Sequence, residues 1–168
     1  MNIKKLTYSA MFVSLGVVLG NVIYIPVGVS KCFPIQHTIN IITAIFLGPL
    51  PSTLIAFLIS LIRNIMGTGS LLAFPGSMIG AFLAGIFYHK MHNKYFAIIG
   101  EVIGTGIIGG LLAFPIAKFI MGKNVLAFFF VYPFLLSTVG GAIIALVLLK
   151  ISEKIDIFNI KNNTLKSK

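Results

Sequence analysis

The sequence predicts an all-α integral membrane protein, built as a bundle of six transmembrane helices. Of its 168 residues, 58% are hydrophobic and only 10% are charged, whereas soluble domains carry about 25% charged residues. The apolar residues form successive runs separated by glycine, proline or basic loops, as expected of helices that cross a bilayer. We expect a single membrane domain over residues 1–150 and a basic cytoplasmic tail over residues 151–168.

The basic residues predict how the chain is oriented. The formal net charge is +10, but most Lys and Arg residues lie at the start of the chain, in one short loop and in the tail: Lys4, Lys5, Lys90, Lys94, Lys150, Lys154, Lys161, Lys166 and Lys168. Basic residues gather in cytoplasmic loops. The pattern therefore predicts a multi-pass protein of the cell membrane with both termini in the cytoplasm, and it argues against nucleic-acid binding.

The first predicted helix spans residues 6–25. Ala10 and Ser14 lie four residues apart and would let another helix approach closely, either from this chain or from a partner. The following segment, 26–36, contains prolines and a glycine, which stop helices, and we predict a loop there. This loop would either cover a binding site or be an ordinary outer connection.

The next two apolar runs, 37–48 and 52–66, are each shorter than the roughly 20 residues that a full crossing requires. A single helix kinked at Pro49 would leave five crossings and place Lys90 and Lys94 outside, against the charge bias. Two passes or a re-entrant hairpin remain open.

Three further helices are predicted over residues 71–88, 96–117 and 126–149. Glu101, in the second of these, is the only acidic residue before residue 153. A carboxylate inside a membrane is a candidate functional group, but this one lies near a helix end, so that a capping role is equally open.

Two stretches, 61–81 and 100–117, share the motifs GTG and LLAFP and are predicted to form walls of one pocket. Polar and aromatic side chains converge at the outer ends of the predicted helices. The candidate substrate-binding residues are Asn21, Tyr24, Gln36, His37, Asn40, Arg63, Asn64, Thr68, Phe74, Ser77, Phe114 and Tyr132.

The chemistry of this set suits a small, flat, nearly neutral ring compound, because small-molecule sites are mostly apolar with a few orienting polar groups. We expect no carboxylate at the depth of His37 to orient it, so that no nucleophile, base and orienting group come together and no catalytic residue is expected. His89 and His92 have the spacing of metal ligands, but neither a carboxylate nor a thiol accompanies them. No metal or other cofactor is therefore expected. No nucleotide-binding GxxxxGK[ST] motif occurs either, and any ATP-driven step would need a partner.

The segments KCFPIQHTIN, LIRNIMGTGSLLAFPGSMIGA and GEVIGTGIIGGLLAFPIA resemble the ThiW family. These are substrate-binding (S) components of energy-coupling factor (ECF) transporters, associated with uptake of the thiamine precursor hydroxyethylthiazole. The resemblance implies the six-helix bundle of S components and three partners, a transmembrane coupling (T) subunit and two ATPase subunits. It also implies that Ala10 and Ser14 dock on the T subunit. The alternatives are an S component for another ring compound, such as thiamine or a pyrimidine precursor, or a stand-alone secondary transporter or membrane enzyme.

Overall fold

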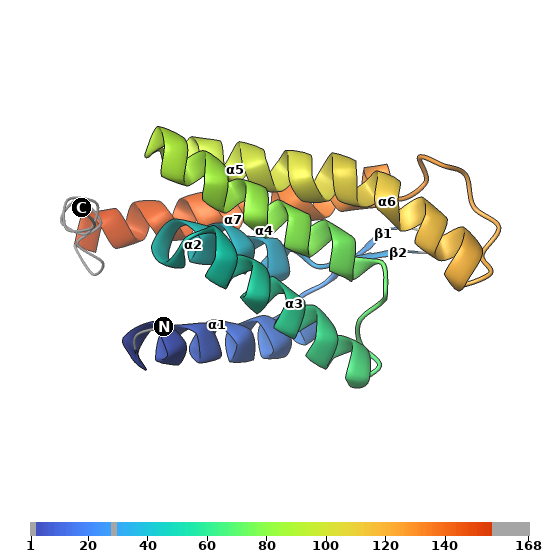
Figure 1. The fold of residues 1–168 in the computed structure, drawn as a ribbon, viewed down its shortest axis with the longest axis horizontal. Coiled ribbons are helices and arrows are strands. Elements are labelled where there is room, and N and C mark those ends of the chain that lie inside the picture. The colour runs from blue at the N-terminus through green and yellow to red at the C-terminus, as the bar shows by residue number, and fades with distance from the viewer. Residues whose placement is uncertain (1–2, 28–29, 156–168) are drawn as a thin grey trace.

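The computed structural model describes residues 3–27 and 30–155, and in this part of the chain it is an elongated bundle of helices with one short β-hairpin (Figure 1). The elements in chain order are α1 (Ile3–Val22), β1 (Ile25–Val27), β2 (Ser30–Cys32), α2 (Pro34–Leu47), α3 (Pro49–Ile65), α4 (Ala73–Met91), α5 (Lys94–Glu101), π-helix η1 (Val102–Gly109), α6 (Gly110–Pro115), π-helix η2 (Ile116–Ile120) and α7 (Val131–Ile155). The four elements from α5 to η2 run on without a break, so the described chain contains six helical rods. The prediction of six helical segments is confirmed.

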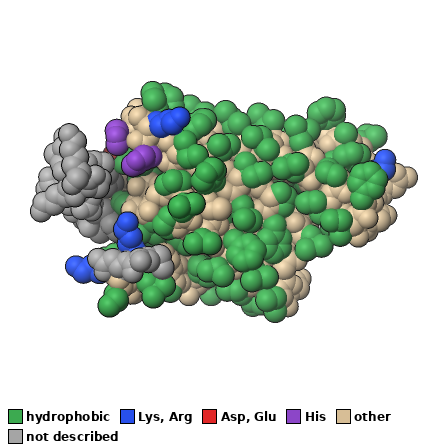
Figure 2. Space-filling model, viewed as in Figure 1, with side chains coloured by type: hydrophobic (Ala, Val, Ile, Leu, Met, Phe, Trp, Pro, Cys, Tyr) green, Lys and Arg blue, Asp and Glu red, His purple; other side chains and the backbone are tan. Residues whose placement is uncertain are grey.

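The length and the apolar composition of the helical rods together show which of them could cross a membrane. Among the described residues, Ile3–Val22, Lys94–Ile120 and Val131–Lys154 are long and apolar enough to cross a bilayer. Figure 2 shows hydrophobic side chains along the length of the bundle, with Lys and His side chains concentrated toward one end. α1 begins and α7 ends at that same end (Figure 1). These features are those of a membrane protein.

The chain reverses direction between α2 and α3. Gly48 has φ 92° and ψ 178°, a conformation that is open essentially to glycine alone, and Pro49 then starts α3 at a position where its missing N–H is not needed. The two helices pack against each other as an antiparallel pair. The expectation that residues 37–66 are not one kinked helix is therefore correct.

α4 and the rod that contains η1 approach each other at glycines on both sides. A Cβ on Gly104 would lie 2.6 Å from the Cα of Gly80, and one on Gly109 would collide with the Cα of Gly76. The contacts on η1 are thus five residues apart while those on α4 are four apart. This offset follows from the π-helix, whose hydrogen bonds join residues i and i+5.

α1 has two different faces. Its inner face packs on α2 and α3, where a Cβ at Gly16 would collide with the side chain of Ile59. Ala10 and Ser14 lie outside this face and are exposed, with the Ser14 hydroxyl donating a hydrogen bond to the Ala10 carbonyl at 3.0 Å. In the part of the chain that the structure describes, the pair is therefore open to contact with another helix.

Some boundaries differ from the sequence-based expectation. The segment 26–36 is not an irregular loop, because β1 and β2 pair antiparallel with Ile25 opposite Cys32, and α2 already begins at Pro34. Residues 151–155, expected in the tail, continue α7, and the rest of the predicted tail, 156–168, lies outside the described residues.

Candidate functional site

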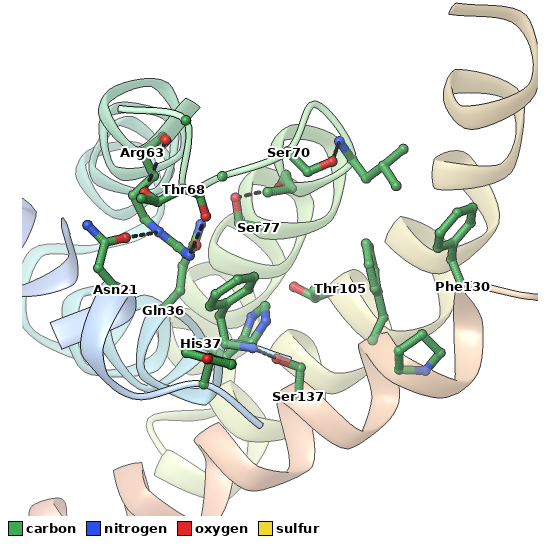
Figure 3. A pocket seen from close by; sticks show the side chains of 18 of the residues that line it. Asn21, Gln36, His37, Arg63, Thr68, Ser70, Ser77, Thr105, Phe130 and Ser137 are labelled. Carbon is green, nitrogen blue, oxygen red and sulfur yellow. Dashed lines mark hydrogen bonds between the residues drawn. The ribbon is translucent and has the colours of Figure 1, made fainter. Parts of the chain in front are cut away.

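A cavity of about 460 Å³ opens at the end of the bundle where the hairpin lies. Side chains from α1, α2, α3, α4, η1 and α7 reach it, together with the glycine-rich turn after α3 (Figure 3). Seven residues of the predicted set line this cavity: Asn21, Tyr24, Gln36, His37, Arg63, Thr68 and Ser77. The walls are mainly apolar with dispersed polar groups, which is the usual character of a small-molecule site.

Arg63 forms one wall of the cavity and is only 1% exposed. Its guanidinium donates hydrogen bonds to Gln36 Oε1 at 2.8 Å, to Asn21 Oδ1 at 3.3 Å and to the Thr68 carbonyl at 3.3 Å. It also lies over the ring of Phe33 at 4.0 Å. Neutral acceptors and a π face thus compensate this buried charge, and among the described residues no carboxylate pairs with it.

A chain of polar groups continues from Arg63 to Ser77, which also lines the cavity. Gln36 Nε2 donates to Ser60 Oγ at 2.9 Å, and Ser60 Oγ lies 3.0 Å from Ser77 Oγ. Ser77 in turn donates to the Ala73 carbonyl at 2.8 Å. Helices α2, α3 and α4 are therefore joined by side-chain hydrogen bonds just where their surfaces meet the cavity.

His37 and Glu101 form a buried pair beneath the cavity. His37 Nδ1 lies 2.9 Å from Glu101 Oε1, and the same oxygen accepts from Asn40 Nδ2 at 3.0 Å and lies 3.0 Å from Thr105 Oγ1. Glu101 is fully buried and does not line the cavity, whereas His37 and Thr105 do.

The expectation that no carboxylate lies at the depth of His37 is therefore wrong. Counting residues along separate helices does not show how deep each helix lies in the bundle. α2 already begins at Pro34, before the predicted start at residue 37, so that His37 lies about one turn into the helix.

The hairpin is fastened to α7 beside the cavity. The backbone N–H of Phe33 donates to Ser137 Oγ at 2.8 Å, and the thiol of Cys32 donates to the Pro133 carbonyl at 3.1 Å. Burial raises the pKa of the Cys32 thiol above its ordinary value. Two residues of the segment 26–36, Phe33 and Gln36, thus line the cavity.

Two predicted polar residues lie away from the cavity lining. Asn40 is completely buried and bonds to Glu101 and to the Ser77 carbonyl. Asn64 donates from Nδ2 to the Ser60 carbonyl at 3.2 Å, one turn earlier in its own helix. Both are engaged with the protein, so a molecule in the cavity would not contact them directly.

Three predicted aromatic residues also lie outside the lining. Phe74 packs on Phe57 with ring centroids 5.7 Å apart, and the ring of Phe114 lies 5.6 Å from the ammonium of Lys118. Tyr132 is 65% exposed. The two copies of the LLAFP motif therefore do not place their phenylalanines on facing walls of the cavity.

Other lining residues were not among the predicted set: Ser70, Thr105, Lys123, Phe130, Phe134 and Ser137. Most of them lie at the predicted outer ends of their segments, and this position is the feature of the sequence that points to them. The sequence does not show which side of these helices faces the cavity, because α7 carries apolar residues on all sides and η1 departs from the α-helical period.

His89 and His92 lie at the end of the bundle away from the cavity (Figure 2). Their ring centroids are 6.2 Å apart, and the described part of the chain contains no group of three or more His, Cys, Asp or Glu side chains placed to hold a metal ion.

Comparison with known proteins gives one family. The family model described as thiamine-precursor transporter protein (ThiW) matches residues 6–155. Searches of curated proteins and of solved structures return no match.

Proposed function

Since the chain belongs to the ThiW family of thiamine-precursor transporter proteins, which are not enzymes, we propose that it is the S component of an ECF-type transporter and that it binds hydroxyethylthiazole. In this proposal the chain is a multi-pass protein of the cell membrane with both termini cytoplasmic, and the cavity opens to the outside.

The cavity beside the hairpin is the observation that carries the proposal. Its volume of about 460 Å³ lies within the range of about 300–1,000 Å³ typical of small-molecule sites. Phe33, Phe130 and Phe134 supply flat apolar surface for a ring, and His37 and Ser77 supply hydrogen-bonding groups for a hydroxyl. This combination favours a small heterocyclic alcohol.

The energy for uptake would come from partners. The sequence has no nucleotide-binding motif, so we propose a T subunit and two ATPase subunits. The exposed pair Ala10 and Ser14 on α1 is the proposed docking surface for the T subunit, because small residues allow two helices to approach closely.

Binding measurements on the purified protein test the substrate. We expect hydroxyethylthiazole to bind more tightly than thiamine or the hydroxymethylpyrimidine precursor in isothermal titration calorimetry. Tighter binding of thiamine or the pyrimidine would move the assignment to that compound, and an absence of binding by all three would contradict the proposal.

A proton-coupled secondary transporter is the second candidate. Such a carrier needs titratable groups inside the membrane, and the buried His37–Glu101 pair beside the cavity provides them. A transport assay, described in the Discussion, separates the two candidates.

A further inference from the structure

Glu101 is buried against the residues of the cavity without reaching the cavity itself. It is 0% exposed, and its Oε1 is surrounded by His37 Nδ1, Asn40 Nδ2 and Thr105 Oγ1 at 2.9–3.0 Å. A carboxylate in a membrane bundle is costly. Its position directly behind a cavity-lining histidine points to a role exerted through that histidine.

The hydrogen bonds around Glu101 Oε1 favour a proton on Nδ1 of His37. The amide nitrogen of Asn40 is only a donor, so Glu101 Oε1 must be an acceptor. An ionised carboxylate only accepts hydrogen bonds, and in that state His37 Nδ1, which contacts the same oxygen, donates its proton to the bond. In a neutral imidazole with the proton on Nδ1, the other nitrogen, Nε2, is a hydrogen-bond acceptor.

Nε2 of His37 is free to meet a ligand. Within the part of the chain that the structure describes, this nitrogen has no hydrogen-bond partner, and His37 lines the cavity. Figure 3 shows its imidazole among the groups gathered there, between Thr105 and Ser137.

We propose that Glu101 is a positioning residue that holds His37 with Nε2 as an acceptor, and that this acceptor selects ligands that carry a hydroxyl group. This inference rests on the proposed function and deepens it. The hydroxyl of a thiazole alcohol donates to Nε2, whereas an ether or a plain alkyl group leaves the acceptor unsatisfied in a desolvated site.

The selection of hydroxyl-bearing ligands can be tested by comparing the affinities of ligands that differ only at that group. The probes are hydroxyethylthiazole, its O-methyl ether and the corresponding ethylthiazole. Loss of one hydrogen bond to a desolvated group should weaken the ether and the ethyl compound about tenfold to a hundredfold relative to the alcohol. His37→Ala should bring the ratio of affinities close to one, and an unchanged ratio in this variant would overturn the proposal.

Glu101→Leu separates positioning from a structural role. Leucine offers no acceptor to Nδ1, so the proton is no longer held there and can move to Nε2. A positioning role predicts that the alcohol-to-ether ratio falls. A merely structural role predicts that both affinities fall together and the ratio stays, which would count against the proposal. Asn40→Ala is the matched control, because it removes another donor to the same oxygen, and the ratio should persist there.

A spectroscopic measurement does not depend on any ligand. His89 and His92 are exposed at the far end of the bundle. The double variant His89→Gln, His92→Asn leaves His37 as the only histidine of the sequence. Asparagine is chosen at position 92 because it tolerates the left-handed backbone there (φ 49°). ¹⁵N spectra of the imidazole at neutral pH should show Nδ1 protonated and Nε2 bare, with the pattern altered by Glu101→Leu. A proton on Nε2 in the parent protein would refute the positioning role. If hydroxyethylthiazole fails to bind while the ¹⁵N pattern is as expected, the substrate assignment fails and the positioning role stands.

Discussion

Arg63 joins four parts of the chain through one side chain. Its donors reach α1, α2 and the turn after α3, and its planar group covers Phe33 beside the hairpin. Arginine suits this position because its fork of donors is rigid and its flat face stacks on aromatic rings. The sequence pattern predicts Arg63 as a substrate-binding residue. The structure places it in contact with both the turn and the cavity.

Arg63→Lys should therefore lower stability even though the charge is retained. Lysine cannot bond to Asn21, Gln36 and the Thr68 carbonyl at once, and hydrogen bonds to charged groups contribute about 1.5–3 kcal/mol each. We expect a loss of at least one such bond, seen as a lower melting temperature of the detergent-solubilised protein. Lys118→Gln, an exposed lysine outside the cavity lining, is the control and should melt like the parent.

Cys32 offers a residue-scale probe of the hairpin, since it is the only cysteine in the sequence. It is 2% exposed and its thiol bonds to the Pro133 carbonyl. Because burial raises its pKa, the reactive thiolate forms only at pH values above the ordinary range of a cysteine, and the rate of alkylation should rise steeply there. Bound ligand should slow the reaction further. Rapid alkylation at pH 7 that ligand does not change would show that the hairpin does not close over the cavity.

At the scale of elements, the contact between α4 and η1 depends on the absence of side chains. A Cβ on Gly104 would lie 2.6 Å from the Cα of Gly80, so Gly104→Ala must separate the helices or strain them. Overpacking of this kind costs about 1–3 kcal/mol.

Gly140→Ala is the matched comparison in α7, where the added Cβ would meet only the Pro34 ring at an ordinary 3.4 Å. Alanine favours a helix over glycine by about 0.5–1 kcal/mol, so this variant should melt at or above the parent temperature. Equal melting temperatures for the Gly104 and Gly140 variants would show that the close approach does not matter for stability.

The sequence predicts the helices better than the site, and the reason is physical. Apolar runs, prolines and basic loops are local signals, so the six segments and their order follow from them. The cavity depends on the depth and rotation of each helix, which packing decides. Phe74 and Phe114 show this limit, because the repeated motif places them at similar depth while their side chains turn to Phe57 and Lys118. His37 and Glu101 show it too, since residues 64 apart in the sequence meet through the packing of α2 on α5.

The whole molecule has a basic end and an end with the cavity, and its orientation can be measured. With Cys32 replaced by serine, we expect Asn124→Cys to be labelled by an impermeant reagent on intact cells and Met91→Cys to stay unlabelled, because basic loops remain in the cytoplasm. Both positions are exposed in the structure. Asn93, in the same basic loop, is not used for labelling because its side chain caps α5 by accepting a hydrogen bond from the Tyr95 N–H at 3.0 Å. Labelling of Met91→Cys alone would reverse the proposed orientation.

Transport by the isolated chain distinguishes the two functional candidates. Liposomes containing only this protein should bind hydroxyethylthiazole without concentrating it, because the chain carries no nucleotide-binding motif. Concentrative uptake that follows an imposed proton gradient, and that Glu101→Gln abolishes, would instead identify a proton-coupled carrier.

The π-helix η1 has a consequence for the evolution of chain length. It presents Gly104 and Gly109 to α4 at a spacing of five, where an α-helix would need four. A relative lacking one residue here would keep both contacts in a regular α-helix, so gaps in alignments of related sequences should fall between residues 104 and 109. Deletion of Ile108, which points away from the bundle at 37% exposure, should therefore be tolerated. Deletion of the equally exposed Phe82 in α4 should not, because it would turn the rest of that helix by about 100°.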